Sequence, residues 1–501
     1  MWRFTILNAI KREANITYTE NGAVTYRSTM SDCLDFFSTA GALRSAEEEE
    51  IIKRFLRAYG ENPDMAMKIL FFTRDVREGL GERRVFRTIL RAMGNLHPES
   101  VKKNIPFIGE YGRYDDLLCL LDTACRAETV AFIKERLEAD CRNLAQGKPV
   151  SLLAKWLPSV NATNWETVRT AVTLAKLLGM KPVEYRKTLS ALRKAENLLE
   201  NNLREKDYSF DYSKQPSNAL FKYRAAFLRN DASRYWDFMD KVSRGKALLH
   251  ADNLMPYELV RKCLRTDIDP PFNEDLSPEE KTVLNTTWDA LPDFGNKENA
   301  LAVVDTSGSM YLDFRDYQVL PATVALSLGI YFAERNKGQF HNHFMTFSAT
   351  PQLLQMKGET FLEKVEYLST FDEVADTNLE AVFRVLLEVA VKNRIPQEEL
   401  PSTLYIISDM EFNECTQDSD ATNFHNAQEM FRAAGYRLPK VVFWNVDSRW
   451  QQQPVTQNEQ GAVLVSGCNP RLFSQVISGE VNPEKFMREI LGSARYAAIT
   501  A

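Results

Sequence analysis

An aspartate and two serines alternate directly after an apolar stretch in the C-terminal half of the chain. In LAVVDTSGSM, residues 301–310, Asp305 is followed at every second position by Ser307 and Ser309. One carboxylate and two hydroxyls at this spacing can present oxygen atoms to a hard cation such as Mg²⁺, which takes six oxygen ligands in an octahedron. The same segment can instead form a turn whose side chains cap the next helix.

Two further oxygen-bearing residues follow in suitable places. Thr377 lies in ADTNLE ahead of a predicted helix, and Asp409 ends the apolar run in LYIISDMEF. Thr377 also begins a T-x-x-E pattern with Glu380, which is typical of a helix capping box, and Asp409 alone can be a turn residue at a strand end. Glu411 is a candidate additional ligand, although we expect an exposed surface carboxylate at that position.

This set of side chains favours binding over catalysis. Serine hydroxyls carry no charge, so a divalent ion held by one or two aspartates stays under-neutralised and takes another anionic oxygen from a partner. No His or Glu base is evident beside these residues in the sequence to activate a water. The sequence also lacks a P-loop, a nucleophile elbow with a recognisable base and a Gly-rich dinucleotide loop. We therefore expect a protein that is not an enzyme.

Predicted strands and helices alternate around these residues. The strands are expected at 300–304, 340–347, 403–407, 440–446 and 462–465. The helices between and after them are expected at 317–334, 379–391, 421–434 and from about 483 onward. Such alternation predicts a mostly parallel, doubly wound α/β sheet, in which ligands bind at the carboxyl ends of the strands. Because the first strand ends at Val304, Asp305 falls where a site is expected.

The rest of the chain divides into three parts. Residues 1–30 contain NITYTENGAVTYR, whose Asn21-Gly22 predicts a β-hairpin that packs on the other domains. Residues 31–265 hold short amphipathic helices joined by polar turns, which predicts stacked helix pairs as in an α-solenoid. Residues 266–299 form an acidic, proline-containing linker with one helix starting at Ser277. The α/β domain is then expected over residues 300–501.

Charge is distributed unevenly along the chain, although the net charge is only -6. Residues 51–250 hold 36 Lys and Arg against 24 Asp and Glu, whereas residues 301–501 hold 16 against 25. On the helix predicted from Glu82, Arg84 and Arg91 are spaced so that they share one face with Arg87. A row of guanidinium groups can follow the phosphates of a nucleic acid.

The basic half yields a set of candidate RNA contacts. The candidates are Arg74, Arg77, Arg83, Arg84, Arg87, Arg91, Arg113, Lys155, Lys222, Arg224 and Arg229. Four aromatic residues among them can stack on unpaired bases: Tyr111, Tyr114, Trp156 and Tyr223. Each has a structural alternative, because Asp75, Glu78 and Glu82 are close enough in sequence to pair with the arginines, and aromatic residues of helix pairs usually lie in the core.

Other features narrow the class of protein. The seven cysteines are scattered without any CxxC spacing, so we expect reduced thiols and neither disulfides nor a zinc site. No run of 18 apolar residues occurs, and the first residues lack the apolar centre of a secretory signal. We expect a monomeric cytoplasmic protein with no membrane association.

The oxygen-bearing residues together resemble a known site. DTSGS, the threonine of DTN and the aspartate of SDMEF are similar to the metal-ion-dependent adhesion site of the von Willebrand factor A domain, over residues 300 to about 495. The resemblance implies a Mg²⁺ or Mn²⁺ ion whose shell is completed by an acidic group of a partner. It implies as ligands Asp305, Ser307, Ser309, Thr377 and Asp409. That family usually has a glycine before the threonine, where this chain has Asp376.

A second resemblance spans nearly the whole chain. The stretches FFTRDVREGLGERRVFR, FIGEYGRYDDLL, LLAKWLPSVNA and KYRAAFLRND, with GAVLVSGCNPRLF near the end, are similar to the Ro autoantigen (TROVE) group and its uncharacterised bacterial and plant relatives. The resemblance implies a ring of HEAT-like helical repeats closed by an A domain. It also implies binding of small structured noncoding RNA of the Y RNA type, and of RNA ends.

Two functions follow from these resemblances. The first is a non-catalytic RNA-binding protein whose cation site either recruits a nuclease or another protein through an acidic side chain or locks the ring. The alternative is a metal-dependent protein-interaction adaptor that binds no RNA.

Overall fold

The computed structural model divides into two compact units. It describes residues 10, 13–196, 198–265, 272–295, 299–311, 319–347, 350–370, 377–414, 421–476 and 482–501. The sheet unit comprises Met1–Ile69, Glu78–Leu80 and Leu254–Ala497. The helical unit comprises Leu70–Arg77, Gly81–Asn253 and Ala498–Ala501.

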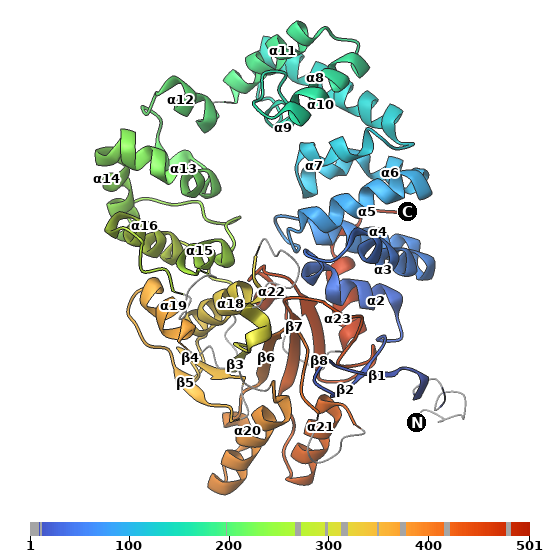
Figure 1. The fold of residues 1–501 in the computed structure, drawn as a ribbon, viewed down its shortest axis with the longest axis vertical. Coiled ribbons are helices and arrows are strands. Elements are labelled where there is room, and N and C mark those ends of the chain that lie inside the picture. The colour runs from blue at the N-terminus through green and yellow to red at the C-terminus, as the bar shows by residue number, and fades with distance from the viewer. Residues whose placement is uncertain are drawn as a thin grey trace. The chain divides into compact units, whose positions relative to one another are not determined.

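A six-stranded mixed sheet forms the core of the sheet unit (Figure 1). Its strands, in spatial order, are β5 (Leu353–Gln355), β4 (His343–Thr346), β3 (Ala300–Val304), β6 (Thr403–Ser408), β7 (Lys440–Asn445) and β8 (Ala462–Ser466). All neighbours run parallel except β5, which is antiparallel to β4. Every residue of β3 and β6 is buried, as expected for parallel strands covered on both faces.

Helices cover this sheet, and the predicted alternation of strands and helices is confirmed for the main elements. The helices after β3 are α17 (Gly308–Tyr311), α18 (Pro321–Arg335), α19 (Phe361–Ser369), α20 (Leu379–Asn393), α21 (Asn423–Ala433), α22 (Leu472–Gln475) and α23 (Pro483–Leu491). Strand β5 and helix α19 were not predicted. Strand β5 has only 3 residues and exposes Leu353 and Gln355, so it lacks the apolar pattern of a buried strand.

Helix α18 is buried along almost its whole length. It packs on β3 and β6 with one side and on α15 (Pro256–Cys263) with another. At its middle, a Cβ added to Gly329 would lie 2.6 Å from a methyl group of Val304, so only glycine allows this close approach to the sheet. The close packing of α18 thereby fixes Val304, the last residue of β3.

The observed units differ from the expected domain boundaries. Helices α2 (Asp32–Thr39) and α3 (Glu48–Glu61) were expected with the helical domain, but α2 packs on β8 and on α23. The backbone N–H of Gly41 donates to Ser466 Oγ at 3.0 Å, and the Phe37 and Phe486 rings meet edge to face at 6.3 Å. The amphipathic pattern of a helix does not show which element its apolar face covers, so this assignment needed the tertiary structure.

The predicted N-terminal hairpin and linker helix are both confirmed. Strands β1 (Ile16–Tyr18) and β2 (Val24–Tyr26) pair antiparallel, and Gly22 between them has φ +83°, a value that favours glycine. Helix α16 (Pro278–Asp289) begins at the expected place: the Ser277 hydroxyl accepts from the N–H of Glu280 at 3.2 Å.

The helical unit consists of short helices that pack mainly on neighbours in the sequence. They are α5 (Arg83–Leu96), α6 (Pro98–Asn104), η2 (Ile105–Phe107), α7 (Ile108–Tyr111), η3 (Tyr114–Leu120), α8 (Arg126–Ala145), α9 (Leu153–Trp156), α10 (Trp165–Leu177), α11 (Pro182–Ala195), α12 (Leu199–Glu205), η4 (Tyr212–Lys214), α13 (Ser217–Asn230) and α14 (Ala232–Ser243). Helix α4 (Pro63–Arg74) enters this unit with its last turn. The helices α10 and α11 pack together, as do α13 and α14. In the described part of the chain, no helix is long and apolar enough to cross a membrane.

Candidate functional site

The sheet places Asp305 and Asp409 side by side. Val304 pairs with Ile407 across the parallel strands β3 and β6, and the N–H of Asp305 donates to the Ile407 carbonyl at 3.0 Å. The chain runs from β3 to β4 on one side and returns to β6 on the other, so these two strand ends flank the point where the strand order reverses. In α/β sheets, ligands bind at such a point.

Hydrogen bonds join four of the five expected ligands into one group. The backbone N–H of Ser307 donates to Asp305 Oδ1 at 2.9 Å, and Ser309 Oγ donates to Asp409 Oδ2 at 3.2 Å. The two serine hydroxyls lie 3.1 Å apart. Ser408, which the sequence did not suggest, donates to Asp305 Oδ2 at 2.6 Å. We refer to Asp305, Ser307, Ser309, Ser408 and Asp409 as the oxygen cluster.

Thr377, the fifth expected ligand, makes no side-chain hydrogen bond to this cluster in the described residues, and its contacts are with the segment after Asp409. Its N–H donates to Asn413 Oδ1 at 3.1 Å, and its carbonyl accepts from the N–H of Asn413 at 2.9 Å. The predicted capping box is wrong, because the N-cap of α20 is Asn378, whose side chain accepts from the N–H of Ala381 at 2.9 Å. Asp376, at the expected glycine position, lies outside the described residues.

Burial sets the electrostatics of the two aspartates. Asp305 is fully buried and Asp409 is 4% exposed. Burial, followed by the charge of Asp409, raises the pKa of Asp305 to about 6. Burial also raises the pKa of Asp409, against the opposing effect of Arg449. Two buried carboxylates this close destabilise each other, and a cation between them would relieve the repulsion.

The donor set fits a hard cation. The oxygen cluster offers two carboxylates and three hydroxyls, which are the oxygen ligands that Mg²⁺ and Mn²⁺ accept. In the part of the chain that the structure describes, no group of three or more His, Cys, Asp or Glu side chains could hold a metal. The fit therefore depends on the hydroxyls, which is why zinc or another metal that prefers nitrogen and sulfur ligands is not expected.

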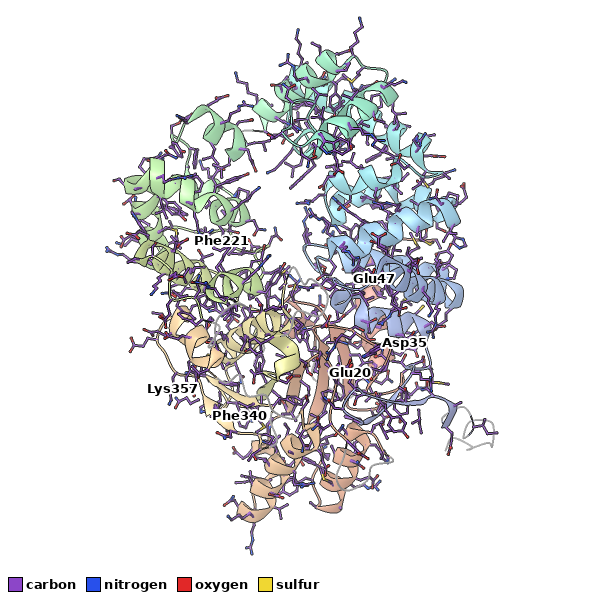
Figure 2. All side chains as sticks on the ribbon, in the orientation of Figure 1. Glu20, Asp35, Glu47, Phe221, Phe340 and Lys357 are labelled. Atoms are coloured by element: carbon purple, nitrogen blue, oxygen red, sulfur yellow. The ribbon has the colours of Figure 1, made fainter. Side chains whose placement is uncertain are left out.

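An arginine that the sequence did not suggest contacts the cluster. Arg449, in the loop after β7, is 7% exposed at its side chain and forms an ion pair with Asp409 Oδ2. Its Nη1 lies 3.3 Å from Oε2 of Glu20, which belongs to the N-terminal hairpin. Glu20 is labelled in Figure 2. Residues 409 and 449 are far apart in the sequence, so no local pattern could have indicated this contact.

The expectation for Glu411 was wrong. Its side chain is not exposed but 2% accessible, because the hairpin covers it. Glu411 Oε2 accepts from the N–H of Glu20 at 2.8 Å, and Oε1 accepts from Gln452 Nε2 at 2.7 Å. Burial is the main reason that the pKa of Glu411 is raised to about 7.

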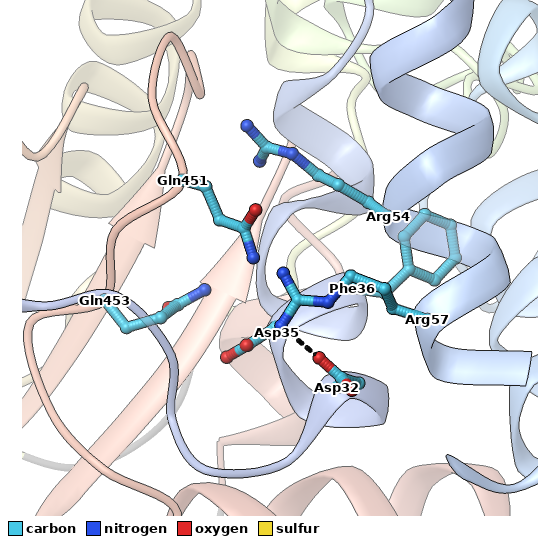
Figure 3. Close-up of a pocket in the computed structure, with 7 residues that line it drawn as sticks. All are labelled: Asp32, Asp35, Phe36, Arg54, Arg57, Gln451 and Gln453. Carbon is cyan, nitrogen blue, oxygen red and sulfur yellow. Dashed lines mark ion pairs between the residues drawn. The ribbon is translucent and has the colours of Figure 1, made fainter. Parts of the chain in front are cut away.

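A small cavity is lined in part by the same loop (Figure 3). Seven residues line it: Asp32, Asp35, Phe36, Arg54, Arg57, Gln451 and Gln453. Its volume is about 10 Å³, enough for about one water molecule. Arg57 pairs there with Asp32, while Arg54 Nη1 donates to Ser448 Oγ at 2.8 Å. The cavity is too small for a ligand, and the Arg54 hydrogen bond to Ser448 anchors the start of the loop that carries Arg449.

The helical unit contains all eleven candidate RNA contacts, and they divide by exposure. Arg77, Arg83, Arg84 and Arg91 are exposed, the last three on α5. Arg229 and Lys222 on α13 are exposed as well. These side chains are accessible to a phosphate.

Three of the candidate arginines are engaged within the protein. Arg74 is 2% exposed, and its Nε lies 2.8 Å from Oδ2 of the fully buried Asp116. Arg87 Nε donates to Asp116 Oδ1 at 2.5 Å and its Nη2 lies 2.8 Å from Asp115 Oδ2. Arg113 pairs with Asp115 at 3.2 Å. Because Arg74 has almost no accessible surface, its guanidinium is not available to a phosphate.

Aromatic rings accompany several of these cations. The Arg113 guanidinium lies over the Trp156 ring at 4.2 Å, and Lys155 Nζ lies 5.5 Å from the same ring. On α13, Lys222 lies over Tyr223 at 4.9 Å and Arg224 over Phe221, labelled in Figure 2, at 4.7 Å. Tyr111 is 2% exposed and meets Phe71 edge to face at 5.2 Å, so for this residue the core alternative holds.

One accessible group on α10 was missed by the sequence reasoning. Trp165 is 67% exposed at the first position of α10, and Arg169 and Lys176 are exposed on the same helix face. The spacing of four and seven residues between them is helical, but without a structure an exposed face cannot be told from a buried one.

Two family models match the chain. A domain of unknown function, DUF2828, matches residues 19–134 and 127–294, and another domain of unknown function, DUF7788, matches residues 299–490. The two matches meet within the expected linker. The uncharacterized protein L728 of Acanthamoeba polyphaga mimivirus is 30% identical over 520 residues, which cover 95% of this chain and 87% of that protein.

Among solved structures, the chain is similar to the crystal structure of the Deinococcus radiodurans RO (RSR) protein. The sequence identity is 12%, the TM-score is 0.41, and the match covers 90% of this chain and 92% of that chain.

Proposed function

We propose that this chain, which belongs to the family of the domain of unknown function DUF2828, is a non-catalytic RNA-binding protein of the Ro type. In this proposal the helical unit is a HEAT-like repeat that holds small structured noncoding RNA through its phosphates. The sheet unit is a von Willebrand factor A domain whose oxygen cluster holds Mg²⁺ or Mn²⁺ and takes an acidic group from a protein partner.

The observation that carries the RNA proposal is the separation of charge between the two units. The helical unit holds 32 Lys and Arg against 22 Asp and Glu, a net of +10. The sheet unit holds 30 against 46, a net of -16. The helical unit therefore attracts a polyanion, whereas the sheet unit repels it. Without this separation, a chain of net charge -6 would not attract nucleic acid.

The arrangement of the exposed cations supports phosphate contacts. Arg83, at the first position of α5, and Arg91, about two turns further on, are both exposed. Arg113 lies over the Trp156 ring, and the positive charge of Arg83 acts on it. Guanidinium groups bind phosphate oxygens bidentately, and fixing Arg113 on an aromatic ring lowers the entropy lost on binding. Contacts of this kind recognise shape and backbone, which suits folded RNA.

The cation site is proposed to act in binding and not in hydrolysis. Asp305 and Asp409 would hold the ion with the hydroxyls of Ser307 and Ser309, and Thr377, which the resemblance also implies, would be a further ligand, directly or through water. The ion supplies a Lewis-acidic position for an anionic oxygen of a partner. A protein with an exposed acidic side chain is the partner class that this chemistry favours, and a nuclease is one candidate.

The test of RNA binding is an electrophoretic mobility shift with structured RNA across a series of salt concentrations. The triple variant Arg77→Gln, Arg83→Gln, Arg91→Gln should bind more weakly, and the slope of log affinity against log salt should decrease by about 2 to 3. The control with the same change in charge is Lys392→Gln, Arg432→Gln, Arg437→Gln on the sheet unit, which should bind as the unchanged protein does.

Two results would overturn the proposal. One is a protein that purifies gently without nucleic acid and shifts no RNA at low salt. The other is an equal effect of the two triple variants. If a partner protein is captured in a way that ribonuclease does not affect and EDTA abolishes, the adaptor alternative is correct instead.

A further inference from the structure

The N-terminal hairpin is held against the oxygen cluster by an unbroken set of contacts. Thr19 Oγ1 donates to the carbonyl of Phe412 at 2.6 Å, and Asn21 Nδ2 donates to the carbonyl of Glu411 at 2.6 Å. Between them, the N–H of Glu20 donates to the Glu411 carboxylate at 2.8 Å. All three contacts fall on the segment that directly follows Asp409.

Arg449 connects this hairpin to the cluster. One guanidinium nitrogen pairs with Asp409, a ligand of the proposed cation, and another lies 3.3 Å from Glu20 Oε2. Trp450 Nε1 donates to the other Glu20 oxygen at 2.5 Å, so the Glu20 carboxylate is held by two consecutive residues of the loop. The planar guanidinium can bridge two carboxylates in a way that a lysine ammonium cannot.

Charge explains why an arginine is needed at this point. Asp305, Asp409, Glu411 and Glu20 bring four carboxyl groups together, the first three of them nearly inaccessible to water. Arg449 contacts two of them, Asp409 and Glu20. Burial lowers the pKa of its guanidinium, but the charges of Asp409 and Glu20 raise it and outweigh burial. A divalent ion at the oxygen cluster would compete with Arg449 for the negative charge of Asp409, whose Oδ2 Arg449 contacts.

We propose that Arg449 is an internal counter-ion that competes with the divalent cation for Asp409. When the ion binds, Arg449 leaves Asp409 and pairs with Glu20 alone, so the hairpin and the cation site are coupled. The cluster thus has a closed form, in which a guanidinium neutralises Asp409, and an open form, in which the ion does. This inference rests on the cation site of the proposed function and adds a residue that regulates it.

The loop is anchored on both sides of Arg449. Ser448, one residue before, is anchored to α3 by Arg54 and to the Ala42 carbonyl through its N–H at 3.1 Å. Gln453, four residues after, exchanges backbone hydrogen bonds with Tyr26 of the hairpin at 2.8 and 3.0 Å. With both ends fixed, the side chain of Arg449 can change partners while the backbone keeps its place.

The test measures Mn²⁺ binding to the full chain by electron paramagnetic resonance, in which the signal of the free ion falls as the protein binds it. Arg449→Gln should bind Mn²⁺ roughly tenfold more tightly than the unchanged protein, because a positive charge beside the ion is removed. Glu20→Gln should bind several-fold more weakly, because Arg449 then has only Asp409 as its partner. Arg437→Gln, an exposed arginine at the amino end of β7, is the control with the same charge change and should leave affinity unchanged.

A conservative variant distinguishes competition between Arg449 and the ion for Asp409 from simple repulsion between two positive charges. Arg449→Lys keeps the charge but cannot bridge both carboxylates, so it should bind Mn²⁺ more tightly than the unchanged protein and more weakly than Arg449→Gln. It also keeps the test valid if Arg449→Gln fails to fold, which thermal unfolding would show. Equal affinity of Arg449→Lys and the unchanged protein would overturn the competition.

The outcomes distinguish this inference from the proposed function. If the unchanged protein binds Mn²⁺ and Asp305→Asn abolishes the binding, the cation site stands. If Arg449→Gln then binds no more tightly, or Glu20→Gln binds no more weakly, the counter-ion role alone is wrong. If neither the unchanged protein nor Arg449→Gln binds Mn²⁺, the cation site itself is wrong, and the counter-ion role with it.

Discussion

Asp305 and Asp409 lie at the ends of neighbouring parallel strands and share the hydroxyl of one serine between them. Ser408 Oγ is 2.6 Å from Asp305 Oδ2 and 3.4 Å from Asp409 Oδ1. One hydroxyl proton can serve only one of these carboxylates at a time. Asp305 accepts from uncharged donors, the Ser307 N–H and the Ser408 hydroxyl, whereas Asp409 pairs with Arg449, so a cation at this point would compensate the charge of Asp305 as well.

Asp305→Asn should separate the two effects of this carboxylate. Without divalent ions the variant should be at least as stable as the unchanged protein, because burial and Asp409 both disfavour the charged form of Asp305. With Mg²⁺ at about 100 times its dissociation constant, the unchanged protein should gain about 2.7 kcal/mol and the variant nothing. Thermal unfolding with Mg²⁺ and with EDTA measures both. Glu366→Gln, an exposed carboxylate on α19, is the control that should keep the Mg²⁺ effect.

Asp35 should give the stability of the sheet unit a pH dependence. Burial raises its pKa to about 6, against 3.8 for the ordinary group, although the N–H of Thr29 donates to Oδ1 at 2.7 Å. The folded state then binds more protons than the unfolded state between about pH 4 and 6, so stability from this group is present at low pH and falls as pH rises through that window. The loss by pH 7 should be on the order of 2 kcal/mol.

Asp35→Asn removes this titration and should be more stable than the unchanged protein at pH 7 but not at pH 4. Urea unfolding at both pH values measures the difference. A difference between the two proteins that does not change with pH would contradict the raised pKa.

Arg74 and Arg91 should have opposite roles, although both were candidates for RNA contact. Arg74→Ala leaves the carboxylate of Asp116 buried with one partner fewer and should cost about 3 kcal/mol of stability. Arg91→Ala removes an exposed side chain, so stability should change by less than about 0.5 kcal/mol. RNA affinity should fall for Arg91→Ala with a decrease of about 1 in the salt slope. Chemical denaturation and the mobility shift together test the pair, and a large stability loss in Arg91→Ala would contradict the assignment.

Gly41 should be essential to the packing of α2 on the sheet. A Cβ there would lie 2.6 Å from the Ser466 carbonyl and 2.7 Å from Gly467 Cα, both backbone atoms that cannot move aside cheaply. Gly41→Ala should therefore lower stability by about 2 kcal/mol or more. Gly60, inside α3 with nothing within 4 Å of a Cβ, is the matched control, and Gly60→Ala should stabilise by about 0.5–1 kcal/mol. Thermal unfolding of the two variants tests this, and equal midpoints would contradict it.

The sequence alone determined the elements whose signals are local. The hairpin at Asn21-Gly22, the helix starting after Ser277 and the strand ending at Val304 all appear where they were predicted. Turn geometry, helix capping and apolar runs depend on a few adjacent residues, so they can be recognised without the fold. The same holds for the positions of Asp305 and Asp409, because parallel strands bring their carboxyl ends to one edge of the sheet.

Only the tertiary structure decided which groups meet from distant parts of the chain. In the folded chain Arg449 pairs with Asp409 and Glu20, and Glu411 is buried under the hairpin. Arg74 is buried against Asp116, and α2 packs on β8. An isolated sequence shows that a residue carries a charge or an apolar face, but its burial and partner depend on segments hundreds of residues away. Whether a charged side chain contacts solvent, a ligand or an opposite charge is therefore settled by packing and not by local pattern.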